Sequence, residues 1–363
     1  MNEFVVAATR SMRDYASRVI DHVKKFPSFS MLGDIIDGTG LLETDRFADG
    51  EMEVAVTRSV RGMDVILIAS CSRNEAGLPV EEAKIELYHS IDALKRSQAK
   101  KIILFEPFIS CSRSDRTTRR NSVGLWIHFR TVASLGASHI LTYQLHSKIS
   151  QSMLDPSECT LDDIRALTLL EKYLCDNYIR NLEFLEKTVR TKWAFCSVDA
   201  GGENQVRDFA DAFGASLVVA HKQRDYSTVN SIKSINILSA EPLEGKILWI
   251  VDDLIDTASS MESLIRALAP HKPAEVNIIV VHALFSPPAA EKLKCLQDQG
   301  LLNRIIVTDS IVPSSEIIRS LEVVSSTELS ARLIHTFMTN KSMSKIMESF
   351  DAESYLKTAS LFS

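Results

Sequence analysis

The chain has 363 residues, with 41 Lys and Arg against 47 Asp and Glu, a formal net charge of −6 and 45% hydrophobic residues. At roughly 150 residues per domain, this length and composition predict a globular protein of two domains and exclude a mini-protein, a coiled coil and a disordered tail. No block of basic residues forms the footprint of a duplex-binding protein, so we expect no nucleic-acid partner.

The sequence shows no segment expected to enter a membrane or direct export. Its longest apolar run, Val276–Phe285, is shorter than the ~18 residues that cross a bilayer. The stretch Phe4–Ala8 is too short for the apolar part of a signal peptide. The six cysteines contain no C-x-x-C pair, so we expect reduced, mostly buried thiols rather than a zinc site or disulfides. These features predict a cytoplasmic protein without a membrane partner.

Short apolar runs alternate with amphipathic stretches along the chain, which is typical of βαβ units around a parallel sheet. The strands expected in the first half are Phe4–Ala7, Glu51–Thr57, Val65–Ala69, Lys101–Phe105 and His139–Gln144. The helices expected there are Ser11–Lys24, Glu81–Arg96 and Val123–Leu135. From Leu154 to Thr191, apolar residues recur at helical spacing, which predicts a long helix or a helical pair between the halves.

The second half repeats the same alternation. Its expected strands are Ala194–Val198, Leu217–Ala220, Ile247–Val251, Val276–His282 and Arg304–Thr308. Its expected helices are Gln205–Phe213, Ser260–Leu268, Ala289–Gln297 and Ser326–Thr339. The similar order of elements in the two halves suggests two related α/β domains.

The sharpest site signal is the run that follows Lys246. An apolar strand leads directly into Asp252 and Asp253, and ligands of doubly wound sheets collect at the carboxyl ends of strands. Small hydroxylated residues then precede a helix, whose N-terminal N–H groups can hold a phosphate while the aspartates accept hydrogen bonds from sugar hydroxyls. The alternative is simple helix capping by Asp256 or Ser259, which does not explain two acids at a strand end. The run therefore predicts a ribose-phosphate site.

This run resembles the phosphoribosyl-pyrophosphate-binding signature shared by phosphoribosyltransferases and phosphoribosyl pyrophosphate synthetases. Further segments are similar to synthetase motifs, in the same order: Arg46–Glu51, Ser59–Val65, Phe105–Asp115, Leu141–His146, Ser197–Gly202, His221–Arg224, His282–Ala289 and Val307–Ile311. Each motif alone is modest, but their shared order favours the synthetases over the transferases, which need only one such domain.

The resemblance implies an α/β fold of two successive phosphoribosyltransferase-like domains, each a mainly parallel sheet flanked by helices. It places an ATP-binding domain at residues 1–163, with the tail 343–363 packed on it, and a ribose-5-phosphate-binding domain at 164–342. It implies a ribose-phosphate diphosphokinase that transfers the diphosphoryl group of ATP to the C1 hydroxyl of ribose 5-phosphate, giving phosphoribosyl pyrophosphate and AMP for nucleotide biosynthesis. The alternatives are a non-catalytic regulatory homologue of the synthetase and a phosphoribosyltransferase.

The same resemblance assigns roles to individual residues. The expected ATP-binding residues are Phe47, Asp49, Glu51, Arg113, Asp115 and His146. The expected ribose-5-phosphate-binding residues are Asp252, Asp253, Asp256, Thr257, Ala258, Ser259 and Ser260. His146 and Asp199 are the expected metal residues for Mg²⁺. The alternative for His146 is a core imidazole without a role in metal binding. In the family the Phe47 segment reaches into a neighbouring subunit's site, which implies a homo-oligomer built from dimers, such as a hexamer.

The expected catalytic residues are Lys222 and Arg224. They lead into the polar segment Asp225–Ser234, which we interpret as a mobile loop that closes over the migrating diphosphoryl group. The alternative is a solvated basic loop without a catalytic role.

Four differences depart from the usual family pattern and motivate the regulatory alternative. Gln144 stands where the family has Asp near the metal, and Ser114 replaces Gln beside the ATP arginine. The usual Gly-Phe-Phe is replaced by Ser150–Leu154. The phosphate loop has Ser259 in place of glycine, and if this position requires a positive φ, serine would be strained by roughly 1–2 kcal/mol.

Overall fold

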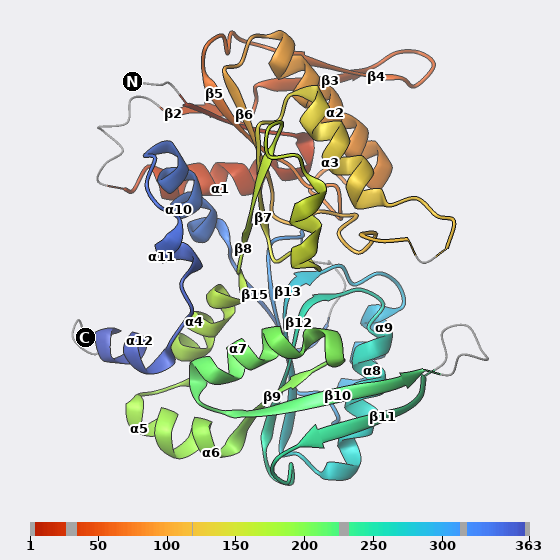
Figure 1. The fold of residues 1–363 in the computed structure, drawn as a ribbon, viewed down its shortest axis with the longest axis vertical. Coiled ribbons are helices and arrows are strands. Elements are labelled where there is room, and N and C mark those ends of the chain that lie inside the picture. Colours follow the sequence, from red (N-terminus) through yellow and green to blue (C-terminus); the bar gives the residue numbers. More distant parts are fainter. Residues whose placement is uncertain (1–3, 27–34, 118, 225–231, 313–317, 360–363) are drawn as a thin grey trace. The chain divides into compact units, whose positions relative to one another are not determined.

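The computed structural model describes residues 4–26, 35–117, 119–224, 232–312 and 318–359, and the chain forms two compact units (Figure 1). The first unit comprises Met1–Arg165, Ser310–Val312 and Ser325–Met347. The second comprises Ala166–Asp309, Pro313–Val324 and Glu348–Ser363.

The first unit is built on a six-stranded sheet of order β2-β1-β5-β6-β7-β8, in which every neighbouring pair is parallel. Its strands are β1 (Phe4–Ala8), β2 (Ile35–Gly38), β5 (Asp64–Ile68), β6 (Lys101–Glu106), β7 (His139–Tyr143) and β8 (Thr160–Ile164). A separate antiparallel hairpin pairs β3 (Leu42–Arg46) with β4 (Met52–Val56). The strands β1 and β5 are buried along their whole length, as expected for a parallel sheet covered on both faces.

The helices of the first unit are η1 (Arg10–Met12), α1 (Arg13–Val23), α2 (Val80–Arg96), α3 (Gly124–Leu135), η3 (Lys148–Met153), α10 (Thr327–Met338) and α11 (Ser344–Met347). Helix α3 ends at Gly136, whose φ of +119° is a backbone conformation that favours glycine. Helix α10 returns from late in the chain to pack on α1. The Tyr15 hydroxyl is hydrogen-bonded to Ser326 Oγ at 2.7 Å and to Ser330 Oγ at 2.6 Å.

The second unit is built on a seven-stranded sheet of order β11-β10-β9-β12-β13-β14-β15, parallel except for the antiparallel β10–β11 pair. Its strands are β9 (Trp193–Ser197), β10 (Ser216–Arg224), β11 (Ile232–Ser239), β12 (Ile247–Ile255), β13 (Glu275–Ala283), β14 (Arg304–Thr308) and β15 (Leu321–Val324). Its helices are α4 (Leu167–Tyr178), α5 (Leu182–Phe184), η4 (Leu185–Val189), α6 (Arg190–Lys192), η5 (Ala200–Gly202), α7 (Glu203–Phe213), α8 (Ser259–Leu268), η6 (Ala269–His271), α9 (Ala289–Asp298) and α12 (Ala352–Ala359).

The predicted α/β class with mainly parallel sheets is confirmed, but the prediction of a helical connector over Leu154–Thr191 is partly wrong. Its first apolar residues, Leu161 and Ile164, belong to β8, an edge strand whose other residues are exposed or half-buried. Such a strand lacks the continuous apolar run that marks a buried strand, so its spacing resembled a helix. Residues 167–178 and 182–191 of the connector are helical, as predicted, whereas 154–159 form a turn.

The two compact units differ from the expected domain bounds at the end of the chain. Helix α10 lies in the first unit, although the bounds 164–342 place it with the second. Residues 348–363 lie in the second unit, whereas the tail was expected on the first. Polar contacts help to hold this tail: Arg190 pairs with Glu353 at 2.7 Å, and the Tyr355 hydroxyl donates to Asp176 at 2.7 Å.

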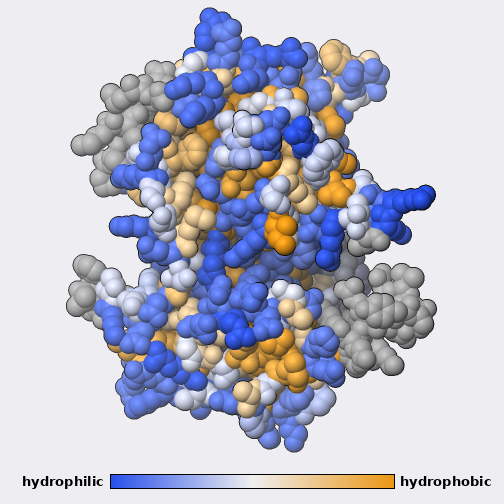
Figure 2. Space-filling view, in the orientation of Figure 1, coloured by the Kyte–Doolittle hydropathy of each residue, from blue (hydrophilic) through white to orange (hydrophobic). Residues whose placement is uncertain are grey.

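The cysteines and the surface agree with the expectations for a globular chain. All six cysteines are free, and all except Cys295 are buried, as predicted. Among the described residues, no helix combines the length and apolar character needed to cross a bilayer. Figure 2 shows hydrophilic side chains interspersed with apolar ones on the visible face of the molecule.

Candidate active site

The expected ribose-phosphate residues form one continuous turn in the second unit. Strand β12 continues through Asp252 and Asp253 to Ile255, four residues beyond its predicted end. Helix α8 begins at Ser259, so the turn between strand and helix is only three residues long. A strand that leads into a helix through so short a turn directs the first N–H groups of the helix toward the carboxyl edge of the sheet.

The left-handed backbone position of this turn is at Ala258. Ala258 has φ +60° and ψ +7° and is the N-cap residue of α8, while its carbonyl accepts from the Glu262 N–H at 2.8 Å. Ser259 lies in the first helical turn, so the strain anticipated at Ser259 falls on alanine instead. A non-glycine residue in this conformation costs about 1–2 kcal/mol.

A lysine that sequence reasoning missed lies beside the turn. Lys292, on α9, donates from Nζ to Ser259 Oγ at 2.7 Å, and its Nζ lies 3.6 Å from Glu262 Oε2. Ser259 Oγ is also 3.2 Å from Thr257 Oγ1. The turn therefore brings together two hydroxyls, an ammonium group and the positive end of a ten-residue helix, which is a suitable environment for a phosphate dianion.

The carboxylates of the second unit gather at the ends of two adjacent strands. Val251 of β12 is paired with Ser197 of β9, so Asp252 and Asp199 follow neighbouring positions of the sheet. Burial raises the pKa of Asp252 well above its usual range, and the negative charges of Asp253 and Asp199 raise this pKa further. The backbone N–H of Asp253 donates to Asp252 Oδ1 at 3.0 Å. This edge is thus strongly acidic and suited to hydroxyl donors or a cation.

Asp199 is held in place by the backbone that follows it. Its Oδ1 accepts from the N–H of Gly201 at 3.0 Å and of Gly202 at 3.3 Å, which caps η5. A Cβ at position 201 would lie only 3.2 Å from the same oxygen, so glycine permits this close approach. His146, the other expected metal residue, is exposed and lies in the first unit.

The described residues contain no group of three or more His, Cys, Asp or Glu side chains placed to hold a metal ion by themselves. Mg²⁺ is usually bound through one or two carboxylates together with substrate phosphates and water. The oxygen donor of Asp199 at a strand end suits such a hard cation, whereas an imidazole is a less usual ligand for it.

The expected ATP arginine lies in a tightly turned segment after β6. Arg113 is exposed, and Asp115 is half-buried. Ser114, between them, accepts from the N–H of Gly124 through Oγ at 2.9 Å, and its carbonyl accepts from the N–H of Leu125 at 3.1 Å. The serine that departs from the family pattern thus bonds the N-terminus of α3.

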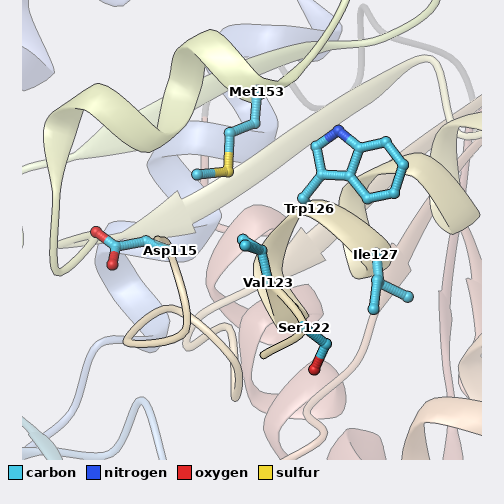
Figure 3. A pocket seen from close by; sticks show the side chains of 6 residues that line it. All are labelled: Asp115, Ser122, Val123, Trp126, Ile127 and Met153. Atoms are coloured by element: carbon cyan, nitrogen blue, oxygen red, sulfur yellow. The ribbon is translucent and has the colours of Figure 1, made fainter. Parts of the chain in front are cut away.

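Asp115 borders a mainly apolar hollow of about 380 Å³ in the first unit. Figure 3 shows its carboxylate and the indole of Trp126 on opposite sides of this hollow, with the thioether of Met153 reaching in from η3. Trp126 is 51% exposed. The hollow combines a ring, a thioether and a carboxylate, groups that can contact a planar base bearing an amino group.

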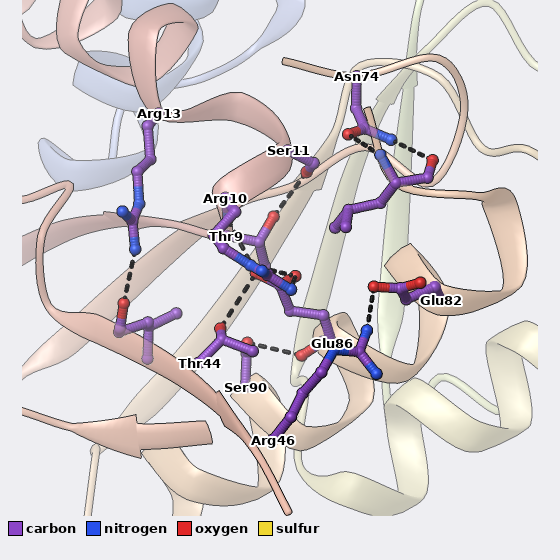
Figure 4. A network of polar contacts seen from close by, with 12 residues as sticks. Thr9, Arg10, Ser11, Arg13, Thr44, Arg46, Asn74, Glu82, Glu86 and Ser90 are labelled. Atoms are coloured by element: carbon purple, nitrogen blue, oxygen red, sulfur yellow. Dashed lines mark hydrogen bonds and ion pairs between the residues drawn. The ribbon is translucent and has the colours of Figure 1, made fainter. Parts of the chain in front are cut away.

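The expected stacking residue Phe47 lies at the tip of the β3–β4 hairpin. Its N–H donates to the Glu51 carbonyl at 2.9 Å, and Asp49 Oδ1 accepts from the Glu51 N–H at 3.1 Å, which closes the turn. The strand end next to this turn is anchored on α2 by an Arg46–Glu82 ion pair (Figure 4). With this strand end fixed and its ring 54% exposed, Phe47 is held at the surface of its own unit.

The buried acid Glu86 supports the same hairpin from α2. Glu86 is 2% exposed and pairs with Arg10 at 2.8 Å. Its Oε1 accepts from the Arg10 N–H at 2.9 Å and lies 3.4 Å from Thr44 Oγ1 of β3 (Figure 4). Helix α2, the short helix η1 and the hairpin are therefore joined through one carboxylate.

The expected catalytic residues Lys222 and Arg224 lie near the end of β10, where their backbone is paired with Ile235 and Ile232 of β11. Their side chains and residues 225–231 lie outside the described part of the chain. Residues 232–234 belong to β11, so the prediction that the loop extends to Ser234 is wrong for its final three residues. The β-branched residues Ile232, Ile235 and Ile237 were the available signal for this strand.

Sequence reasoning also missed Asp163 beside the Gln144 segment. Gln144 is buried with φ +45°, and the next N–H, of Leu145, donates to Asp163 Oδ1 at 2.9 Å. Burial raises the pKa of Asp163, while this hydrogen bond lowers it. A carboxylate from β8 thus lies near the position where the family's usual aspartate is replaced by Gln144.

Comparison with known proteins identifies similar chains. The model of the N-terminal domain of ribose phosphate pyrophosphokinase matches residues 5–136, and the phosphoribosyl transferase domain matches residues 174–304. Ribose-phosphate pyrophosphokinase from Corynebacterium ammoniagenes is 30% identical over 280 residues, covering 77% of this chain and 80% of that protein. The Fusobacterium nucleatum enzyme of the same name is 29% identical over 309 residues, covering 85% of this chain and 90% of its own.

A solved structure extends the likeness to three dimensions. The phosphoribosylpyrophosphate synthetase from Mycobacterium smegmatis superposes with a TM-score of 0.77 over 93% of this chain and 100% of its own, at 23% identity. At this identity the superposition shows that the two chains share the fold.

Proposed function

The chain belongs to the ribose-phosphate pyrophosphokinase family, and we propose that it transfers the β,γ-diphosphoryl group of ATP to ribose 5-phosphate. The C1 hydroxyl oxygen attacks the β-phosphorus of ATP, and the bond between this phosphorus and the α,β-bridging oxygen breaks. AMP leaves, the hydroxyl proton is released, and phosphoribosyl pyrophosphate is formed for nucleotide biosynthesis. The observation that carries the proposal is the phosphate turn of the second unit, where hydroxyls, an ammonium group and a helix N-terminus converge beside paired acids.

We assign ribose 5-phosphate to this turn. The 5-phosphate binds the first N–H groups of α8, the hydroxyls of Thr257, Ser259 and Ser260, and Lys292. Asp252 and Asp253 accept hydrogen bonds from the ribose hydroxyls, which would partly offset the burial and the like-charge repulsion that raise the pKa of Asp252. Asp256 and Ala258 shape the backbone of the turn.

ATP is assigned to the first unit, through Arg113, Asp115 and His146. Phe47, Asp49 and Glu51 contribute from the hairpin of a neighbouring subunit, so the enzyme acts as a homo-oligomer built from dimers. The support for this assignment is the exposed ring of Phe47 next to a strand end that Arg46 fixes to α2. This fixed strand end limits movement of the turn toward the site of its own subunit.

Mg²⁺ is the cation that we propose for the reaction, with Asp199 and His146 as the residues that would hold it. When bound, it would neutralise phosphate charge on ATP. Lys222 and Arg224 supply further positive charge at the transferring group, because phosphoryl transfer depends mainly on positioning and charge stabilisation. Their place near the end of the β10–β11 hairpin suits residues that approach the substrate when a loop closes.

We further propose that the protein acts in the cytoplasm. All six of its cysteines are free, including the exposed Cys295. Free thiols persist in a reducing compartment, whereas secreted proteins tend to pair them.

A product assay tests the proposed function. Purified protein is incubated with ATP, Mg²⁺ and ribose 5-phosphate, and AMP is resolved from ADP. We expect AMP to form in equal amount with the new diphosphate ester, and only when ribose 5-phosphate is present. Binding of both substrates without AMP under any phosphate or salt condition would favour the regulatory homologue instead, which the substitution at Gln144 motivates.

A further inference from the structure

A buried acid lies immediately before the segment 107–115, which carries Arg113 and Asp115. Glu106 is the last residue of β6 and is 0% exposed. Its Oε2 is bonded to Nε2 of His128 on α3 at 2.7 Å, and its Oε1 accepts from the Sγ of Cys71 at 3.5 Å. The start of the segment is therefore bonded directly to the helix that follows it.

Cys71, His128 and Tyr88 form a polar cluster around Glu106. With its proton on Nε2, His128 donates to Glu106 and leaves Nδ1 to accept from the Tyr88 hydroxyl at 3.2 Å. Burial raises the pKa values of Cys71 and Tyr88, and the nearby Glu106 charge raises them further. The thiol and the phenol thus stay protonated, and the buried carboxylate is surrounded by hydrogen-bond donors.

The far end of the same segment is bonded to the same helix. The N-cap residue of α3, Val123, makes no side-chain hydrogen bond to the described start of the helix. Ser114 Oγ accepts from the Gly124 N–H at 2.9 Å instead. A Cβ at Gly124 would lie 3.3 Å from Ser114 Cβ and 3.4 Å from Cys111 Cβ, so the segment packs closely against the start of α3. Two separate polar contacts therefore hold the two ends of one segment on one helix.

We propose that Glu106 and Ser114 are positioning residues for ATP, which hold the segment 107–115 against α3 through His128 and Gly124. The proposal rests on the assignment of ATP to this segment. Burial of a carboxylate destabilises the fold unless its hydrogen-bond partners are in place. The end of β6 therefore has one favourable position against α3, in which Glu106 meets His128. When the segment is held in one position, the backbone that carries the exposed Arg113 is also fixed. Nucleotide binding then loses less conformational entropy in this segment.

Four variants separate positioning from general stability. Glu106→Ala leaves His128 without its acceptor, whereas Glu106→Gln keeps an oxygen of similar reach and tests rescue by a conservative change. Glu171→Ala is the matched control, because Glu171 is also 0% exposed but lies on α4 in the second unit. Ser114→Ala provides a milder test at the other end if Glu106→Ala does not fold.

Amide hydrogen exchange without nucleotide is the direct readout, since it does not depend on activity. We expect Glu106→Ala and Ser114→Ala to speed exchange in residues 107–117 by about tenfold or more, and Glu106→Gln to have much less effect. Glu171→Ala should leave this region unchanged. Unchanged exchange in 107–117 for both Glu106→Ala and Ser114→Ala would overturn the proposal, even if the wild-type protein proved inactive.

Kinetics supply the second readout where the wild-type protein forms AMP. We expect Glu106→Ala to raise the KM for ATP by roughly tenfold while the KM for ribose 5-phosphate changes less than about twofold. An equal rise in both KM values would show a general structural role and contradict the proposal. Failure of the wild-type protein to form AMP would instead refute the proposed function.

Discussion

Lys292 on α9 donates a hydrogen bond to Ser259 Oγ at 2.7 Å, so a cation from one helix lies at the N-terminus of another. We expect Lys292→Ala to raise the KM for ribose 5-phosphate by about tenfold, because a charge-assisted bond to the phosphate is lost. The KM for ATP should change little. Steady-state kinetics with each substrate varied in turn measure the difference.

Lys294 is the matched control for this prediction. It is an exposed lysine on the same helix, two residues beyond Lys292. Lys294→Ala should leave both KM values near those of the wild type. Equal effects of the two substitutions would mean that only the general charge of α9 matters.

The backbone of the phosphate turn predicts opposite effects of glycine at adjacent positions. Ala258→Gly should raise the Tm by a few degrees, because it removes about 1–2 kcal/mol of left-handed strain and adds a smaller entropic cost. Ser259→Gly should lower the Tm, because it places glycine in the first turn of α8 and removes the Lys292 contact. Thermal unfolding of the two variants measures both Tm values. A higher Tm for Ser259→Gly would mean that the strain lies at Ser259 and not at Ala258.

Asp252→Asn should stabilise the unliganded protein while weakening ribose 5-phosphate binding. Because the pKa of Asp252 is raised in the folded chain, its contribution to stability is present below the unfolded pKa of about 3.9 and is lost as pH rises through the folded value. Asparagine does not ionise, so the variant keeps this stability.

We expect a Tm gain of roughly 2–4 °C at pH 8, as for ~1 kcal/mol in a domain of this size, and a smaller gain at pH 5. Differential scanning calorimetry across this pH range measures the effect. A gain that grows as pH falls would contradict the sign of the pKa shift.

Mixed oligomers test whether Phe47 acts in a neighbouring subunit. Phe47→Ala and Arg113→Ala should each reduce activity strongly alone. After subunit exchange in an equal mixture, half of the dimers contain both variants, and each such dimer has one intact site, so about a quarter of all sites should recover. Absence of recovery, with mixed dimers demonstrated by mass spectrometry, would place Phe47 in the site of its own subunit.

The parts of the fold that sequence predicted well are those with a strong apolar pattern. The buried strand β12 and the amphipathic helix α8 were both identified, and Asp252 and Asp253 were placed near the carboxyl end of the strand. The polar edge strand β8 was mistaken for helix because half-burial leaves no continuous apolar run.

The site details that were missed depend on tertiary contacts. Lys292 lies 33 residues from Ser259 on an ordinary amphipathic helix, so nothing local marks it as a phosphate contact. The left-handed position at Ala258 was missed because alanine carries no signal for positive φ. Ser114 was read as a lost ATP residue, whereas its bond to Gly124 is visible only once α3 is in place.

Transfer of an isotopic label from ATP tests the central proposal most directly. With [β-³²P]ATP, Mg²⁺ and ribose 5-phosphate, we predict that all transferred label enters the sugar product as a diphosphate ester and that the nucleotide product is unlabelled AMP. Label retained in ADP, which would mean transfer of the γ-phosphoryl group alone, would contradict the account.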